Sequence, residues 1–120
     1  MATVETDEHA EKDSIFLYYH KAEGYKIEVK ALFRDGNLII DGYDCGDLVE
    51  KVQGDWDHEY WLTLPPASVN KLYKVLSVRR NDRDNLLKAL TKHAYGEECY
   101  SMCREFLTKN DIEFDAMFWS

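Results

Sequence analysis

Three residues near the middle of the chain could in principle support acid–base or nucleophilic chemistry. Asp57 and His58 are adjacent and offer an acid and a base, and Cys45 offers a nucleophile. The sequence has no serine or cysteine elbow that would present a nucleophile on a sharp turn. It also has no glycine-rich loop that could hold a phosphate group. Nothing in the spacing brings the three residues together, so we predict no catalytic residue and retain a small enzyme only as an alternative.

The possible metal ligands are scattered along the chain. The histidines are isolated from one another: His9, His20, His58 and His93. Cys99 and Cys103 are four residues apart on one predicted helical face, which also fits an apolar stripe that uses cysteine as a small hydrophobic residue. A structural zinc site needs paired ligands from two places in the chain. We therefore expect no metal ion and no cofactor.

The region best suited to binding a partner is residues 41–61, which hold seven acidic residues and a single base, Lys51. Large aromatic side chains lie among these acids, and Gly42, Gly46 and Gly54 predict frequent turns. Acidic and aromatic side chains together suit the capture of a basic protein. The predicted partner-binding residues are Tyr43, Asp44, Asp47, Glu50, Asp55, Trp56, Asp57, Glu59 and Trp61. The alternative is an ordinary acidic loop whose carboxylates are only solvated.

The formal net charge of −8 limits the kind of partner. Residues 1–64 carry a net charge of −9 and residues 65–120 a net charge of +1, so the acidity belongs to the first half. Nucleic acid and anionic membrane surfaces need a basic face, and we expect neither as a direct ligand. The N-terminus has no apolar segment, and the three cysteines have no disulfide-framework spacing. These features predict a cytoplasmic protein with free thiols.

The apolar periodicity predicts one α+β domain over residues 14–120, preceded by a polar, flexible tail over residues 1–13. Alternating residues predict five strands, over residues 14–20, 25–33, 37–41, 58–64 and 112–119. Apolar stripes predict helices that begin at Pro65-Pro66 and that span residues 84–95 and 97–109. This order indicates an antiparallel sheet of about five strands with about three helices packed on one face.

Local signals add detail to this arrangement. Asp35-Gly36 predicts a tight hairpin, and Asn81 or Asp82 can cap the second helix. Residues 47–52 are expected to form one or two helical turns, and residues 54–57 a loop. The aromatic residues assigned to the core are Phe16, Tyr25, Phe33, Tyr73, Phe106 and Phe114, and those assigned to the surface are Tyr43, Trp56, Trp61 and Trp119. An exposed edge strand at residues 112–119 or 14–20 would allow a homodimer.

Several segments carry a family resemblance: LIIDGYDCG at residues 38–46, DHEYWLTLPP at 57–66, LYKVL at 72–76 and FDAMFW at 114–119. Together they resemble the small acidic immunity proteins of contact-dependent growth inhibition and related polymorphic toxin systems in bacteria. The resemblance covers most of residues 25–120. It implies a cytoplasmic, non-enzymatic antitoxin that binds the toxin domain delivered by a neighbouring cell, often a basic nuclease such as an RNase. It implies no fixed set of toxin-binding residues.

Two other classes of function remain open at this point. A non-catalytic acidic interaction or regulatory protein would use the same surface on a partner unrelated to toxins. A small enzyme would use Asp57, His58 or Cys45, and its activity would disappear in a folded His58→Ala variant. A neighbouring gene that encodes a large secreted protein with a variable C-terminal domain would favour the immunity protein.

Overall fold

The computed structural model describes residues 13–46 and 57–119. One antiparallel sheet contains five strands in chain order: β1 (Ser14–Ala22), β2 (Tyr25–Arg34), β3 (Asn37–Gly46), β4 (Asp57–Leu64) and β5 (Asp115–Trp119). The helices of these described residues all lie between β4 and β5: α3 (Pro66–Val75), α4 (Arg83–Leu90) and α5 (Cys99–Lys109). The predicted α+β class is confirmed. Residues 1–12 of the tail predicted over residues 1–13, and the helical turns predicted over residues 47–52, fall outside the described residues, whereas Asp13 is described.

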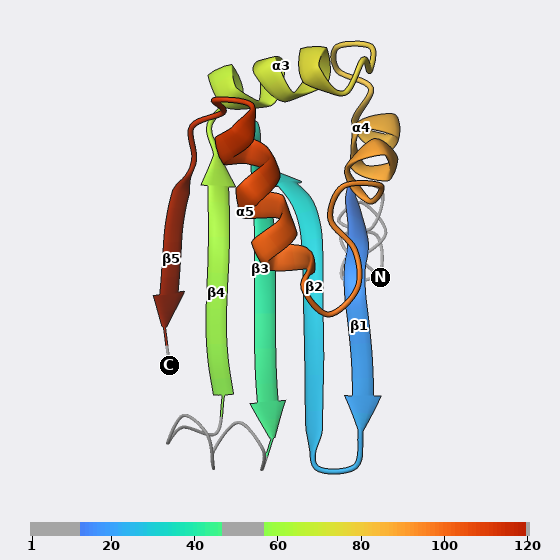
Figure 1. Ribbon diagram of the computed structural model, residues 1–120, viewed down its shortest axis with the longest axis vertical. Helices are drawn as coiled ribbons and strands as arrows, with labels where there is room; N and C mark the ends of the chain where they lie inside the picture. The colour runs from blue at the N-terminus through green and yellow to red at the C-terminus, as the bar shows by residue number, and fades with distance from the viewer. Residues whose placement is uncertain (1–12, 47–56, 120) are drawn as a thin grey trace, which may run out of the picture.

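The helices gather on one face of the sheet, as predicted. Helix α5 crosses the middle of the sheet over β3 and β4, α4 lies beside the start of β1, and α3 crosses one end (Figure 1). The core forms between these helices and the strand side chains that face them. Its fully buried members include Leu38, Ile40, Leu62, Leu64, Leu72, Leu86, Leu90 and Leu107. We call this side of the sheet the helix face and the other side, which no described helix covers, the open face.

Strand β3 runs five residues beyond the predicted end, as far as Gly46. The prediction of turns at Gly42 and Gly46 was wrong, because close packing within the sheet requires both glycines. A Cβ atom on Gly42 would lie 1.9 Å from the ring of Tyr60. A Cβ atom on Gly46 would lie 2.1 Å from the carbonyl oxygen of Gly24, and the φ of Gly46 is +127°. The glycines therefore extend the strand instead of ending it.

The assignment of Phe16 to the core was also wrong, because its side chain is 50% exposed. A β-bulge between Phe16 and Tyr18 interrupts the pairing of β1 with β2. A bulge inserts one residue and changes which side chains face the core. As a result Leu17 is buried, while Phe16 lies opposite Lys30 on the open face, with the Lys30 ammonium 5.4 Å from its ring centroid.

The helix termini follow the capping signals in the sequence. Asp82 caps α4, and its side-chain oxygen accepts a hydrogen bond from the backbone N–H of Asn85 at 3.3 Å. Helix α4 ends at Leu90, five residues before the predicted end, and turns carry the chain onward to the buried Ala94. Asp13 ties the start of β1 to the helix face, because its carboxylate lies 2.9 Å from the guanidinium of Arg83.

Candidate partner-binding face

The predicted partner-binding residues do not all lie on one surface. Tyr43, Glu59 and Trp61 lie on the open face, because they alternate with the residues of β3 and β4 that face the core. Asp44 points to the opposite, helix face. Asp57 is the first residue of β4, but its side chain is outside the described structure. The remaining predicted residues also lie outside the described ranges: Asp47, Glu50, Asp55 and Trp56.

On the open face, the strand register arranges side chains in rows that cross all five strands. The first row, from β1 to β5, is Tyr19, Glu28, Tyr43, Glu59 and Trp119. The second row is Phe16, Lys30, Asp41, Trp61 and Met117. Directly opposed residues of neighbouring antiparallel strands have Cβ atoms about 5 Å apart, so each row is a continuous strip. The first row therefore alternates aromatic rings with carboxylates across the whole sheet.

Charge is unevenly divided across the open face. Strands β3, β4 and β5 contain no lysine or arginine. Strands β1 and β2 contain the bases Lys21, Lys26, Lys30 and Arg34. We call the described open-face side chains of β3–β5 the acidic half: Asn37, Ile39, Asp41, Tyr43, Cys45, Glu59, Trp61, Thr63, Asp115, Met117 and Trp119. A positively charged partner would be drawn to this side of the face.

Two shallow hollows flank Asp41 and Glu59, where the acidic half meets the open-face side chains of β2. One, of about 230 Å³, is lined by Glu28, Lys30, Asp41, Tyr43 and Glu59. The other, of about 300 Å³, is lined by Arg34, Ile39, Asp41, Glu59, Trp61 and Thr63. Burial raises the pKa of Asp41, although the nearby Lys30 and Arg34 act in the opposite direction. A lysine or arginine of a partner could lay its aliphatic stem against the aromatic rings and place its charge at these carboxylates.

On the helix face, the Asp44 side chain takes part in a structural hydrogen bond within the domain. The hydroxyl of Tyr60 donates a hydrogen bond to Oδ1 of Asp44 at 2.8 Å. Burial raises the pKa of Asp44, and the hydrogen bond from Tyr60 opposes this effect. Burial and the neighbouring Asp44 carboxylate also raise the pKa of Tyr60. Asp44 is therefore engaged on the helix face and turned away from Tyr43, Glu59 and Trp61.

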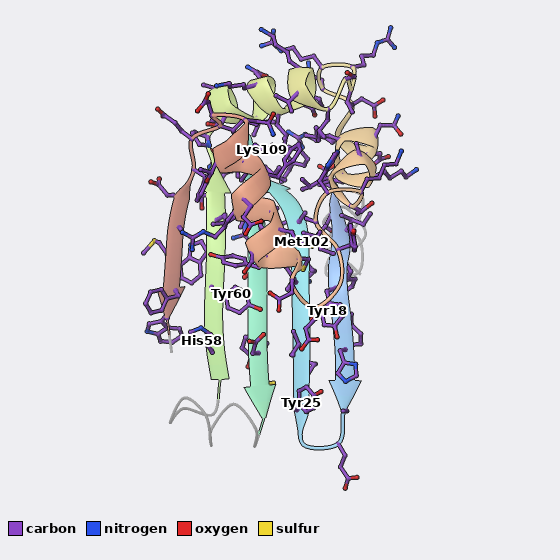
Figure 2. The ribbon with its side chains drawn as sticks, in the orientation of Figure 1. Tyr18, Tyr25, His58, Tyr60, Met102 and Lys109 are labelled. Carbon is purple, nitrogen blue, oxygen red and sulfur yellow. The ribbon has the colours of Figure 1, made fainter. Side chains whose placement is uncertain are left out.

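A cleft of about 360 Å³ opens beside this pair, where the start of α5 meets β3, β4 and β5. Its lining residues are Asp44, His58, Tyr60, Glu97, Glu98, Tyr100, Ser101, Arg104 and Phe118. Figure 2 labels His58 and Tyr60 at successive helix-face positions along β4. The ring of Tyr60 meets that of Tyr100 edge-on at 4.7 Å, and the ring of His58 lies 6.1 Å from that of Phe118. The cleft is thus walled by aromatic rings and edged by three carboxylates and the guanidinium of Arg104.

The three residues considered for catalysis do not meet at one site, because Cys45 and Asp57 are opposed in the register of β3 and β4 while His58 belongs to the other face. Cys45 belongs to the open face and His58 to the helix face, so the sheet separates the nucleophile from the base. The carboxylate opposite His58 in the register belongs to Asp44, and it accepts its hydrogen bond from Tyr60. The Nδ1 atom of His58 is buried and has no hydrogen-bond partner among residues 13–46 and 57–119. The described residues also contain no group of three or more His, Cys, Asp or Glu side chains arranged to hold a metal ion.

The open face also includes residues that the predicted set missed. Glu28 and Asp41 line the same hollow as Tyr43 and Glu59, although Glu28 comes from β2. Met117 and Trp119 extend both rows onto the edge strand. A signal for Glu28 was present in the sequence, because it alternates with apolar residues of β2 that face the core. The neighbours on β5 are separated from β4 by three helices, so no local pattern reveals them.

Comparison with known proteins gives no indication of function for this chain. No protein-family model matches the chain, and neither the curated proteins nor the solved structures contain a match to it. Within residues 13–46 and 57–119, no helix has the length and apolar character needed to cross a membrane.

Proposed function

We propose that this protein is a cytoplasmic immunity protein that binds a basic toxin domain through the acidic half of the open face. Binding would neutralise the toxin, for example an RNase or another nuclease, by covering its active or substrate-binding surface. The observation that supports the proposal is the kind of side chain that β3, β4 and β5 place on the open face. Three adjacent strands carry no lysine or arginine and present the carboxylates of Asp41, Glu59 and Asp115 among large aromatic side chains.

The charges of the two proteins would be complementary. A nuclease must hold phosphate, so its substrate-binding surface is electropositive. An acidic face can cover such a surface and exclude the nucleic acid without performing any chemistry. Complementary charge also accelerates encounter by about one to three powers of ten at low salt. A fast encounter suits an antitoxin that must act before its target is damaged.

Aromatic side chains would supply the apolar part of the interface. Trp119 is 63% exposed in the free protein, while Tyr43 and Trp61 are partly exposed between the strands. Tyrosine and tryptophan are enriched among the residues that contribute most to binding energy at protein interfaces. Their rings are held in rows by the sheet, so they lose little conformational entropy when a partner covers them.

The immunity proposal expects a large secreted protein with a variable C-terminal domain to be encoded beside the gene for this protein. The decisive experiment is co-purification with that C-terminal domain, followed by an assay of its toxin activity. The immunity proposal predicts a one-to-one complex and loss of toxin activity. If the toxin domain stays fully active at saturating concentrations of this protein, the proposal is overturned. A complex with some other basic protein, without inhibition of a toxin, would support the alternative of a non-catalytic interaction or regulatory protein.

We predict that the double charge reversal Asp41→Lys and Glu59→Lys will weaken toxin binding about 100-fold, mainly through slower association. The milder pair Asp41→Asn and Glu59→Gln should weaken it about tenfold, because neutralisation removes the attraction without adding repulsion. Surface plasmon resonance at two salt concentrations measures both effects, and circular dichroism checks the fold.

The matched control is Asp84→Lys with Glu105→Lys. It makes the same change in net charge at exposed positions on α4 and α5, which pack on the helix face. This control should retain association within about threefold of the unmodified protein at physiological salt, because screening limits distant charges. Equal losses in both double variants would show that net charge, and not the acidic half, governs binding.

A further inference from the structure

Strand β5 leaves one edge of the sheet open. It pairs with β4 on one side, and no described strand pairs with its other side. All five of its residues are exposed. Met117, Phe118 and Trp119 are 56%, 76% and 63% exposed, so three consecutive large apolar side chains face solvent at this edge. Such a strand offers unpaired backbone N–H and C=O groups together with an apolar surface.

The two edges of the sheet differ in how they resist pairing with another chain. The opposite edge, β1, has a bulge between Phe16 and Tyr18 and carries Lys21. Bulges, lysine and proline are the devices by which natural proteins protect edge strands. Strand β5 contains none of them, and its register with β4 is unbroken from Asp115 to Trp119. Its short length and the charge of Asp115 at its start are its protective features, and neither interrupts the stretch from Ala116 to Trp119, so β5 is the edge more open to pairing.

Both faces beside β5 are acidic, which indicates the charge of the segment that would pair there. On the open face, Asp115 and Glu59 lie near the edge. On the helix face, Phe118 lines the cleft that also holds three acids, Asp44, Glu97 and Glu98, against one base, Arg104. Because side chains of a strand alternate between faces, a strand added to β5 would place side chains beside carboxylates on both sides. Lysine or arginine at these positions would be favoured by this charge.

We propose that the partner binds by adding an extended, lysine- or arginine-rich segment to the outer edge of β5. This inference rests on the proposed function and names how the toxin domain would dock. Backbone hydrogen bonds to β5 would supply affinity, and the carboxylates on the two faces would select basic side chains. The open face and the edge would then form one continuous interface, because Met117 and Trp119 belong to both.

A second copy of this chain fits the edge less well. Each chain has a formal net charge of −8, and pairing two β5 strands would bring two acidic halves together. Like charges at such an interface oppose association. Sedimentation of the free protein tests directly whether a second copy of the chain pairs with β5. A dimer that disappears in the Phe118→Lys variant would assign the edge to a second copy and overturn the proposal.

The edge can be tested without the toxin by a synthetic peptide of about ten residues that alternates lysine with valine. We expect saturable binding in fluorescence anisotropy, with backbone amide shifts in the NMR spectrum concentrated on β5. The control peptide has the same side chains but carries N-methyl groups on alternate amides, which removes the donors along one edge. It should bind at least about tenfold more weakly, because β-augmentation depends on backbone hydrogen bonds. Equal binding of the two peptides, or shifts concentrated on β1, would overturn the inference.

Variants of the protein separate this inference from the proposed function. Phe118→Lys places a positive charge at the edge at a residue exposed enough to leave the fold intact, and Tyr19→Lys does the same on β1. Phe118→Lys should weaken binding of both the peptide and the toxin domain at least about tenfold, while Tyr19→Lys should leave peptide binding within about twofold. If the toxin domain binds Phe118→Lys as tightly as the unmodified protein, the edge inference fails and the proposed function stands. If the unmodified protein does not bind the toxin domain, the proposed function fails, and the peptide result still decides the edge.

Discussion

Gly42→Ala should lower the free energy of unfolding by about 3 kcal/mol, because the added methyl group overpacks the sheet and displaces a hydrogen-bonded ring. The new Cβ atom would lie 1.9 Å from the ring of Tyr60. That ring cannot move freely, since it packs against Tyr100 and its hydroxyl donates to Asp44. The lower chain entropy of alanine in the unfolded state would offset about 0.5–1 kcal/mol of the loss. Urea unfolding followed by circular dichroism measures the change.

A double-mutant cycle identifies the ring of Tyr60 as the cause. In a Tyr60→Ala background the space above Gly42 is empty, so Gly42→Ala should cost less than about 1 kcal/mol. The comparison variant is Gly96→Ala, where a Cβ atom would meet nothing within 4 Å and only the φ of +72° opposes the substitution. An equal cost of Gly42→Ala with and without the Tyr60 ring would contradict this explanation.

Raising the pH from about 8 to about 10 should lower the free energy of unfolding by about 2–3 kcal/mol through Cys99 and Cys103. Burial raises the pKa of these thiols from an ordinary value of 9.0 to about 11 and about 12. The folded state therefore keeps both protons in a range where the unfolded state releases them. The stability from this effect is complete below pH 9 and is lost as the pH rises toward the raised pKa values.

Urea unfolding at several pH values between about 8 and 10 measures how steeply the free energy of unfolding falls with pH. The variant Cys99→Ala with Cys103→Ala will start from a lower stability, because it leaves space in a core where both side chains are buried. Its stability should nevertheless fall less steeply with pH, since only the buried tyrosines then contribute. If the slope is the same in both proteins, the two thiols are not its source.

Local patterns in the sequence predicted much of the fold. The alternation of Tyr25, Ile27 and Val29 predicted the faces of β2, and Asp35-Gly36 predicted the hairpin, where both residues have positive φ, 52° and 82°. These features depend on neighbours in the chain: a period of two defines a strand face, and a two-residue turn defines a hairpin. Helices α3, α4 and α5 were likewise predicted from their apolar stripes and caps, with errors only at their ends.

The candidate site could be predicted less well from the sequence, because its residues come together through pairing between strands. Glycine was interpreted as a sign of turns, whereas Gly42 allows the ring of Tyr60 to cross its strand. The bulge after Phe16 moved an aromatic residue from the predicted core to the open face, and no residue type marks its position. In both cases the outcome depends on atoms that are distant in the sequence.

The sequence by itself determined the class of the fold, the acidic character of its first half and the side of most strands that faces the core. Each of these follows from composition or from a short-range period. Only the tertiary structure decided that Tyr43 and Glu59 share a row with Trp119, while Asp44 belongs to the other face. The physical reason is that successive strand residues point to opposite faces, so a sequence cluster is split in two. The register of pairing then joins each half to residues from distant strands, and that register is set by non-local contacts.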